Sequence, residues 1–152
     1  MQPIGCVDSL AGVIDRTVRR SVDIDADVAE AWHLLTDPDG IARWLGRLDG
    51  PLPAPGGVAA LVEPDGSTRR LVVESIDDGR SVVFTWWADG DESTASTVTI
   101  SVTETAAGSR VDVVETARSG GAQCRVADAG ALWSDRLVGF ELAAITRSLV
   151  LA

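Results

Sequence analysis

Residues 22–45, with the sequence VDIDADVAEAWHLLTDPDGIARWL, decide the fold of this chain. The stretch passes from the end of an alternating segment through an Asp-rich run into an amphipathic pattern. Asp27 and Glu30 have the spacing of a capping box, in which the Asp accepts a backbone N–H of the first helical turn and the Glu reaches back. The stretch therefore predicts a strand that ends near Ile24 and a helix over about Asp27–Leu35.

A proline ends this helix and begins the next one. Pro38 disfavours a helical backbone at Asp37, because its ring clashes with the preceding residue. Proline also suits the first position of a new helix, where no backbone N–H is needed. We therefore expect a second short helix over about Pro38–Trp44.

Short β-like segments separated by turn sequences fill residues 58–116. Val98, Ile100 and Val102 alternate with threonine and serine, which indicates a strand with one covered and one solvent-facing side. Hairpin-type turns at this spacing predict an antiparallel sheet. The expected strands are Arg16–Ile24, Val58–Glu63, Thr68–Ile76, Ser81–Trp87, Thr94–Thr103 and Ser109–Thr116.

The end of the chain has the pattern of a long amphipathic helix. Trp133, Leu137 and Phe140 recur at helical spacing within a helix expected over about Asp128–Leu151. A curved antiparallel sheet with one apolar face needs a cover, which this helix can supply. The expected fold class is α+β: a helix-grip, with a curved antiparallel sheet of about six or seven strands wrapped around a long C-terminal helix, and two short helices after strand one.

These features resemble the START-like, or SRPBCC, superfamily over about residues 16–150. The resemblance is strongest to the branch named for the activator of heat-shock protein 90 ATPase. It implies a helix-grip fold in which the gap between helix and sheet is a pocket for hydrophobic small molecules or lipids. The residues that carry it are Ile24, Asp25, Ala26, Ala31, Trp32, Leu35, Thr36, Asp37, Pro38 and Trp44, with the triplet Phe84-Thr85-Trp86 and the segment Ser109–Glu115.

The composition excludes several kinds of function. The chain of 152 residues has a net charge of −10, contains no lysine or tyrosine and has a single histidine. Its acidity disfavours nucleic-acid binding, since a negative surface repels phosphates. Without lysine there is no Schiff-base chemistry, and one histidine cannot form a histidine-rich metal site. We therefore expect no metal ion, no cofactor and no nucleic-acid partner.

The chain is expected to form one domain over residues 16–152, after a weakly ordered lead-in at residues 1–15. No apolar run approaches the roughly 20 residues of a membrane helix, and the N-terminus lacks the pattern of a secretory signal. These features predict a cytoplasmic protein without membrane insertion. Cys6 and Cys124 are then expected to be free thiols.

Large apolar side chains on the expected inner faces are candidates for a ligand pocket. Indole rings suit such a pocket, since they bury a large area and keep one N–H for a polar partner. Plain core packing would also explain these residues. The candidate ligand-binding residues are Trp44, Phe84, Trp86, Val98, Ile100, Val113, Glu115, Trp133, Leu137 and Phe140.

Glu115 is the sharpest single candidate, because it continues the apolar face that Val111 and Val113 define on their strand. An acid on an inner face must be paired or hydrogen-bonded, which suits a proton acceptor or a group that anchors a ligand. The alternative is that this end of the strand is wet and that Glu115 pairs with an arginine such as Arg70 or Arg136.

Three functions follow from these features. The first is non-catalytic binding of a hydrophobic small molecule or lipid, because no catalytic set is evident. The second is an enzyme of the cyclase, dehydratase or hydrolase kind that uses Glu115 as acid or base. The third, implied by the family name, is regulation of a chaperone ATPase. A homodimer is also possible through apolar residues on the outer face of the sheet, such as Val73, Val83 or Trp87.

Overall fold

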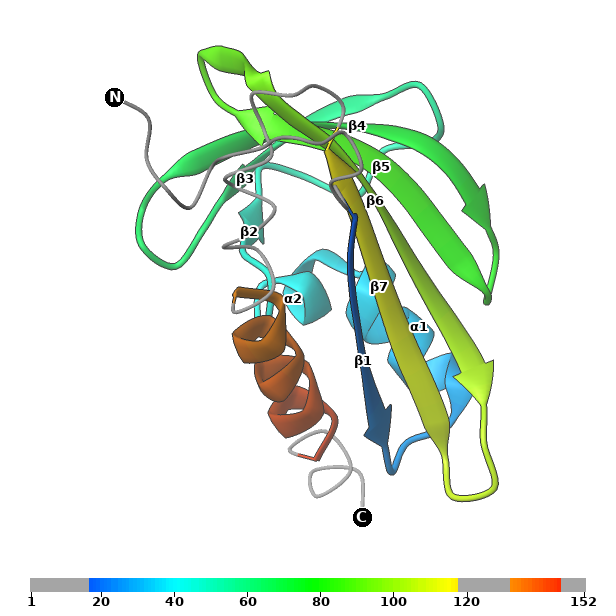
Figure 1. Ribbon diagram of the computed structural model, residues 1–152. Helices are drawn as coiled ribbons and strands as arrows, with labels where there is room; N and C mark the ends of the chain where they lie inside the picture. The colour runs from blue at the N-terminus through cyan, green and yellow to red at the C-terminus, as the bar shows by residue number, and fades with distance from the viewer. Residues whose placement is uncertain (1–16, 118–131, 146–152) are drawn as a thin grey trace, which may run out of the picture.

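Seven strands form one antiparallel sheet in the computed structural model, which describes residues 17–117 and 132–145 (Figure 1). The strand order across the sheet is β1-β7-β6-β5-β4-β3-β2. The elements are β1 (Thr17–Ile24), α1 (Val28–Thr36), α2 (Pro38–Ile41), β2 (Arg47–Leu48), β3 (Val58–Val62), β4 (Thr68–Asp77), β5 (Ser81–Ala88), β6 (Asp91–Glu104) and β7 (Ser109–Ala117). A C-terminal helix follows over residues 132–145. The predicted fold class is confirmed.

The topology is a meander whose last strand pairs with the first. Strands β3 to β7 are joined in sequence as antiparallel neighbours, and β1 then pairs with β7 in the register Thr17↔Thr116 to Ile24↔Ser109. All six predicted strands are present. The two-residue strand β2 was not predicted, because so short a segment has no periodicity to detect.

Both α1 and α2 begin at a capping aspartate, of which only the first, Asp27, was predicted. The Asp27 carboxylate accepts the backbone N–H of Glu30 at 2.9 Å, and the Asp37 carboxylate accepts the backbone N–H of Asp39 at 3.0 Å. Each aspartate thus satisfies a donor of the helix that follows it. The predicted end of the second helix at Trp44 is wrong: α2 ends at Ile41, and the chain continues as turns.

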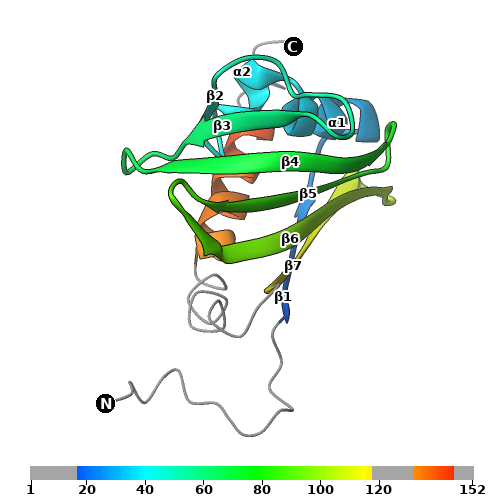
Figure 2. The same cartoon turned by 90° about the horizontal axis from the view of Figure 1, so that it is seen from above.

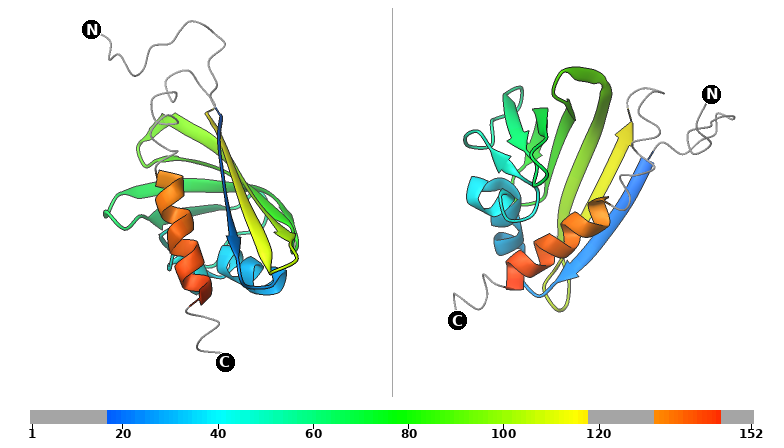
Figure 3. Two further views of the ribbon diagram at one scale, coloured as in Figure 1. Left: turned by 60° about the horizontal axis from the view of Figure 1, so that its bottom comes forward. Right: turned by 90° about the vertical axis from the view of Figure 1, so that its left-hand side faces the viewer.

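The C-terminal helix crosses one face of the sheet, as Figure 3 shows. Figure 2 shows α1 and α2 on the same side. The core lies between these helices and the sheet, and the helix contributes the buried side chains Trp133, Leu137 and Phe140 to it. The parts of the predicted helix at 128–131 and 146–151, and the predicted lead-in at 1–15, lie outside the described residues.

One residue expected on the outer face belongs to the core. Val73 is fully buried together with Leu71, because both point to the helix side of β4. A register shift between Val73 and Ser75 then interrupts the pairing with β5. Val73 is therefore not available for a dimer contact, whereas Val83 and Trp87 are half-buried on the outer side.

Replacing glycine by alanine should change the free energy of unfolding in opposite directions at Gly40 and Gly139. A Cβ at Gly40 would lie 2.7 Å from the Leu34 Cα, whereas a Cβ at Gly139 would meet Trp44 only at an ordinary 3.8 Å. We expect Gly40→Ala to lower the free energy of unfolding by about 1–3 kcal/mol through overpacking. We expect Gly139→Ala to raise it by about 0.5–1 kcal/mol, because alanine favours a helix over glycine. Urea denaturation of both variants tests the pair, and a loss of stability in both would contradict it.

Candidate functional site

A buried carboxylate joins the sheet to the C-terminal helix. Glu115 of β7 is 5% exposed, and its Oε1 accepts the Nε1–H of Trp133 at 2.7 Å. Its Oε2 accepts the Nε1–H of Trp86 at 2.8 Å and also the hydroxyl of Ser96. The donors come from β5, β6 and the helix, so one side chain links three strands and the helix.

The sheet register explains this convergence. Trp86 lies opposite Ser96 in the pairing of β5 with β6, and Ser96 lies opposite Ala117 in the pairing of β6 with β7. Glu115 is two residues before Ala117, so it points to the same face of the sheet. The carboxylate can therefore reach the side chains of both neighbouring positions.

Aromatic rings and guanidinium groups surround this carboxylate. The rings of Trp86 and Trp133 are stacked, with centroids 5.8 Å apart and an angle of 25° between their planes. The Arg69 guanidinium lies 4.2 Å from the centroid of Trp86, and that of Arg136 lies 4.8 Å from the centroid of Trp133. A cation over an indole face is a favourable contact, more so where water is excluded.

The two arginines share one acid. Glu63 accepts a hydrogen bond from Arg136 at 2.6 Å and another from Arg69 at 3.0 Å. Burial lowers the pKa of the Arg136 guanidinium, and the Glu63 carboxylate works in the opposite direction. An arginine nevertheless stays protonated in proteins. The pair therefore ties the C-terminal helix to the end of β3 as a charged contact.

The alternative that Glu115 lies at a solvent-exposed strand end and pairs with Arg70 or Arg136 is wrong. Arg136 pairs with Glu63 instead, and the Nε of Arg70 lies 4.0 Å from a carboxylate oxygen of Asp89. The physical reason is that β7 continues to Ala117 between β1 and β6, so that Glu115 is covered by the helix rather than placed at an exposed end.

In this arrangement Glu115 is suited to hold neighbouring groups in place by accepting their hydrogen bonds. Both of its oxygens already accept hydrogen bonds from side chains. A substrate proton could be taken up only after one of these donors has moved away.

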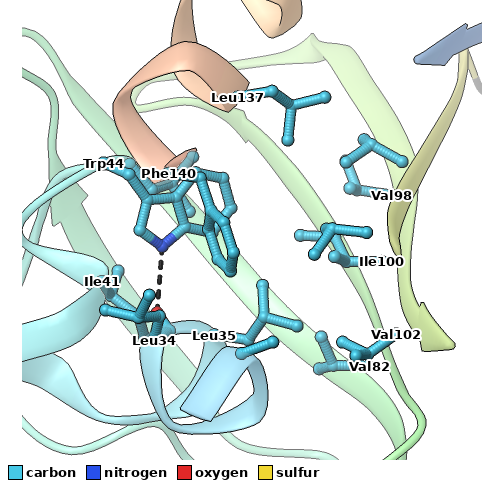
Figure 4. Packing of buried hydrophobic residues seen from close by; sticks show 14 of the residues in the cluster. Leu34, Leu35, Ile41, Trp44, Val82, Val98, Ile100, Val102, Leu137 and Phe140 are labelled. Carbon is cyan, nitrogen blue, oxygen red and sulfur yellow. Dashed lines mark hydrogen bonds between the residues drawn. The ribbon is translucent and has the colours of Figure 1, made fainter. Parts of the chain in front are cut away.

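A small apolar cavity lies elsewhere in the core and shares no lining residue with the cluster around Glu115. Its volume is about 20 Å³, which is room for roughly one water molecule. Figure 4 shows part of its wall, with Trp44 among the buried aliphatic side chains. The lining residues are Leu35, Ile41, Trp44, Leu45, Leu48, Leu52, Leu61, Leu71, Val82, Phe84 and Ile100.

A more open groove of about 270 Å³ lies next to it. Trp44 and Leu45 line the groove as well as the cavity. Glu115 lines neither of the two. The other residues that line the groove are Glu63, Pro64, Asp65, Leu132, Asp135 and Arg136.

The predicted site residues fall into two groups. Trp44, Phe84 and Ile100 line the apolar cavity. Trp86 and Trp133 form the polar cluster with Glu115. The remaining residues are buried in the core between these two places: Val98, Val113, Leu137 and Phe140.

Several residues of the site were missed. Ser96 could have been found, because it continues the inward face of Val98 and Ile100 on the same strand. Glu63 and Arg69 gave no such signal. They flank the turn between β3 and β4, and their role depends on the position of the C-terminal helix.

Two further observations concern only residues 17–117 and 132–145. No group of three or more His, Cys, Asp or Glu side chains among them is placed to hold a metal ion. None of their helices is long and apolar enough to cross a bilayer.

Sequence comparison assigns the family. The family model for polyketide cyclases/dehydrases and lipid transport matches residues 15–149. The chain belongs to this family, which is of the SRPBCC type. No curated protein is similar enough in sequence to match.

Several solved structures share the fold of this family member. DynU16, a protein in the dynemicin biosynthetic locus, is 26% identical with a TM-score of 0.75, over 84% of this chain and 46% of that chain. The chain thus spans less than half of DynU16. MLL2253 from Mesorhizobium loti is 21% identical with a TM-score of 0.75, over 84% of this chain and 96% of that one. CalU16 from Micromonospora echinospora is 22% identical with a TM-score of 0.67, over 88% and 77%.

The carboxylate cluster predicts different effects for two tryptophans. Trp133→Phe keeps a ring but removes the donor to Glu115, so we expect it to lower the free energy of unfolding by about 1.5–3 kcal/mol. The control Trp87→Phe removes an indole N–H from the outer side of the sheet, and we expect it to cost less than about 1 kcal/mol. Urea denaturation followed by circular dichroism measures both, and equal costs would argue against a special role of the cluster.

Proposed function

We propose that this protein binds a hydrophobic small molecule or lipid between its sheet and the helices that cover it, and releases it unchanged. The observation that carries the proposal is the cavity between the sheet and the segment of α1 and α2, all of whose lining side chains are apolar. Apolar lining with a few polar groups at the edge is typical of small-molecule sites. The family description, which includes lipid transport, supports the same role.

The size of the cavity adds a condition to this proposal. A volume of about 20 Å³ is far below the roughly 300 Å³ or more of ordinary ligand pockets. A ligand therefore has to displace part of the wall when it binds. The open groove of about 270 Å³ on the far side of Trp44 and Leu45 offers space for such a displacement.

The chemical character of the residues that line the cavity favours binding without reaction. None of the residues that line it is titratable. The buried acid Glu115 already accepts hydrogen bonds from Trp86, Trp133 and Ser96. A general acid or base has to reach the reacting group directly or through one water.

The second candidate is an enzyme of the cyclase, dehydratase or hydrolase kind. One observation favours it: a carboxyl group is buried in the core of a protein whose family description names cyclases and dehydrases. A substrate hydroxyl would then replace the Ser96 hydroxyl at Glu115. If incubation with a bound compound yields a new product, and Glu115→Gln abolishes this but not binding, the enzymatic function replaces the first proposal.

Regulation of a chaperone ATPase and formation of a homodimer stay predictions. The former rests on the motif at residues 24–44, and the latter on the half-buried Val83 and Trp87. Measurement of chaperone ATP turnover tests the first, and sizing chromatography tests the second.

Ligand binding is tested by native mass spectrometry of protein purified without denaturation and by thermal-shift measurements with fatty acids, polyketides and flavonoids. A ligand at about 100 times its Kd should raise Tm by about 5–10 °C in a domain of this size. Decan-1-ol and its control decane-1,10-diol are compared in the same assay. The diol should raise Tm less, because its second hydroxyl cannot be buried without a partner. If no apolar compound shifts Tm and none is carried through purification, the proposal fails.

A further inference from the structure

The apolar cavity and the open groove are separated by a wall one residue thick. Trp44 and Leu45 line both spaces, and no other residue within 17–117 and 132–145 does so. Trp44 is the larger of the two, and only 6% of it is exposed. A change in the position of this one side chain would therefore join the two spaces.

The indole of Trp44 is held by one polar contact and by ring packing. Its Nε1–H, the sole donor of the side chain, donates to the backbone carbonyl of Leu34 at 3.0 Å, as Figure 4 shows. Its ring meets the edge of Phe140 with centroids 5.1 Å apart. Gly139 of the C-terminal helix faces the backbone of Trp44, where an added Cβ would lie at an ordinary 3.8 Å from the Cα and Cβ of Trp44.

The two spaces differ in polarity. The cavity is lined by apolar side chains alone. The groove also carries the carboxylates of Glu63, Asp65 and Asp135 and the guanidinium of Arg136. The Glu63 carboxylate is already paired with this guanidinium and with that of Arg69. The remaining negative charge of the groove therefore comes from Asp65 and Asp135. The joined space would thus be apolar at its inner end and negatively charged at its mouth.

We propose that Trp44 is the gate of the ligand site, and that the ligand is an amphipathic molecule whose head group donates hydrogen bonds or carries a positive charge. The ligand enters from the groove as the indole swings away from Leu34. Its apolar body then occupies the inner cavity together with the space that the indole has left, and its head stays at the carboxylates of Asp65 and Asp135 at the mouth. This inference rests on the proposed function, and it adds the route of entry and the class of ligand.

The gate is tested by stopped-flow fluorescence with N-phenyl-1-naphthylamine, a neutral apolar probe. Trp44→Phe keeps a ring in the wall but loses the bond to Leu34, so the open fraction rises. We expect its association rate constant to increase about two- to tenfold. The control Trp87→Phe makes the same change outside the wall and should leave the rate constant unchanged.

A second variant opens the wall permanently. Trp44→Ala should bind the probe at least about tenfold more tightly than the wild type, because the joined space no longer has to be opened. Added indole should refill the gap and reverse the gain. Should Trp44→Ala fail to fold, the comparison of Trp44→Phe with Trp87→Phe still decides.

The ligand class is tested by competition with decylamine and decanoate, which share a chain length and differ in the sign of the head group. We expect decylamine to compete about three- to fivefold more tightly, and Asp135→Asn to reduce this ratio. Tighter binding of decanoate would overturn the assignment of the head group.

The outcomes separate the two proposals. If the wild type and Trp44→Phe bind the probe at the same rate, the gate is refuted while ligand binding stands. If no folded form of the protein binds the probe or any of the apolar compounds, the proposed function fails and the gate fails with it.

Discussion

The contact between the Glu115 carboxylate and the two indoles of Trp86 and Trp133 is the constraint on which the rest of the structure depends. A carboxyl group inside a core is unfavourable by several kcal/mol unless donors surround it. Its donors come from β5, from β6 and from the C-terminal helix. All of them are satisfied only when the helix docks in one position, so the cluster selects this position over other ways of covering an apolar sheet.

The core is divided into a polar end and an apolar end by this arrangement. At the polar end, Arg69 and Arg136 cover the indole rings and share Glu63, which fixes the helix to the edge of the sheet. At the apolar end, aliphatic side chains and Trp44 enclose a space of about 20 Å³. The helix is thus anchored by polar contacts where the core is polar, and it only lies over the sheet where the core is apolar.

This division has a consequence for ligand binding. Because the helix is held at Glu115 and at Glu63, undocking it would break several buried polar contacts at once. The wall at the apolar end is retained by far less, namely one indole hydrogen bond and ring packing. Under the proposed function, a ligand would therefore find the lowest cost of opening at Trp44, and the core would stay nearly filled until the ligand binds.

Local patterns in the sequence specify the helices and strands and the faces that they bury. The capping Asp27, Pro38, the alternation of Val98 and Ile100, and the helical spacing of Trp133 are local patterns, and they predicted the fold. The sequence placed Glu115 on an inward face but left open whether that end of the strand is buried or wet. Only the tertiary structure decided which side chains meet. The pairing of Glu63 with Arg136 joins residues 73 positions apart, and the cavity volume depends on how side chains from seven elements and the loops between them fill one space. A local pattern reports the period of the backbone and the side that faces inward, whereas such contacts depend on strand register and on where the helix docks.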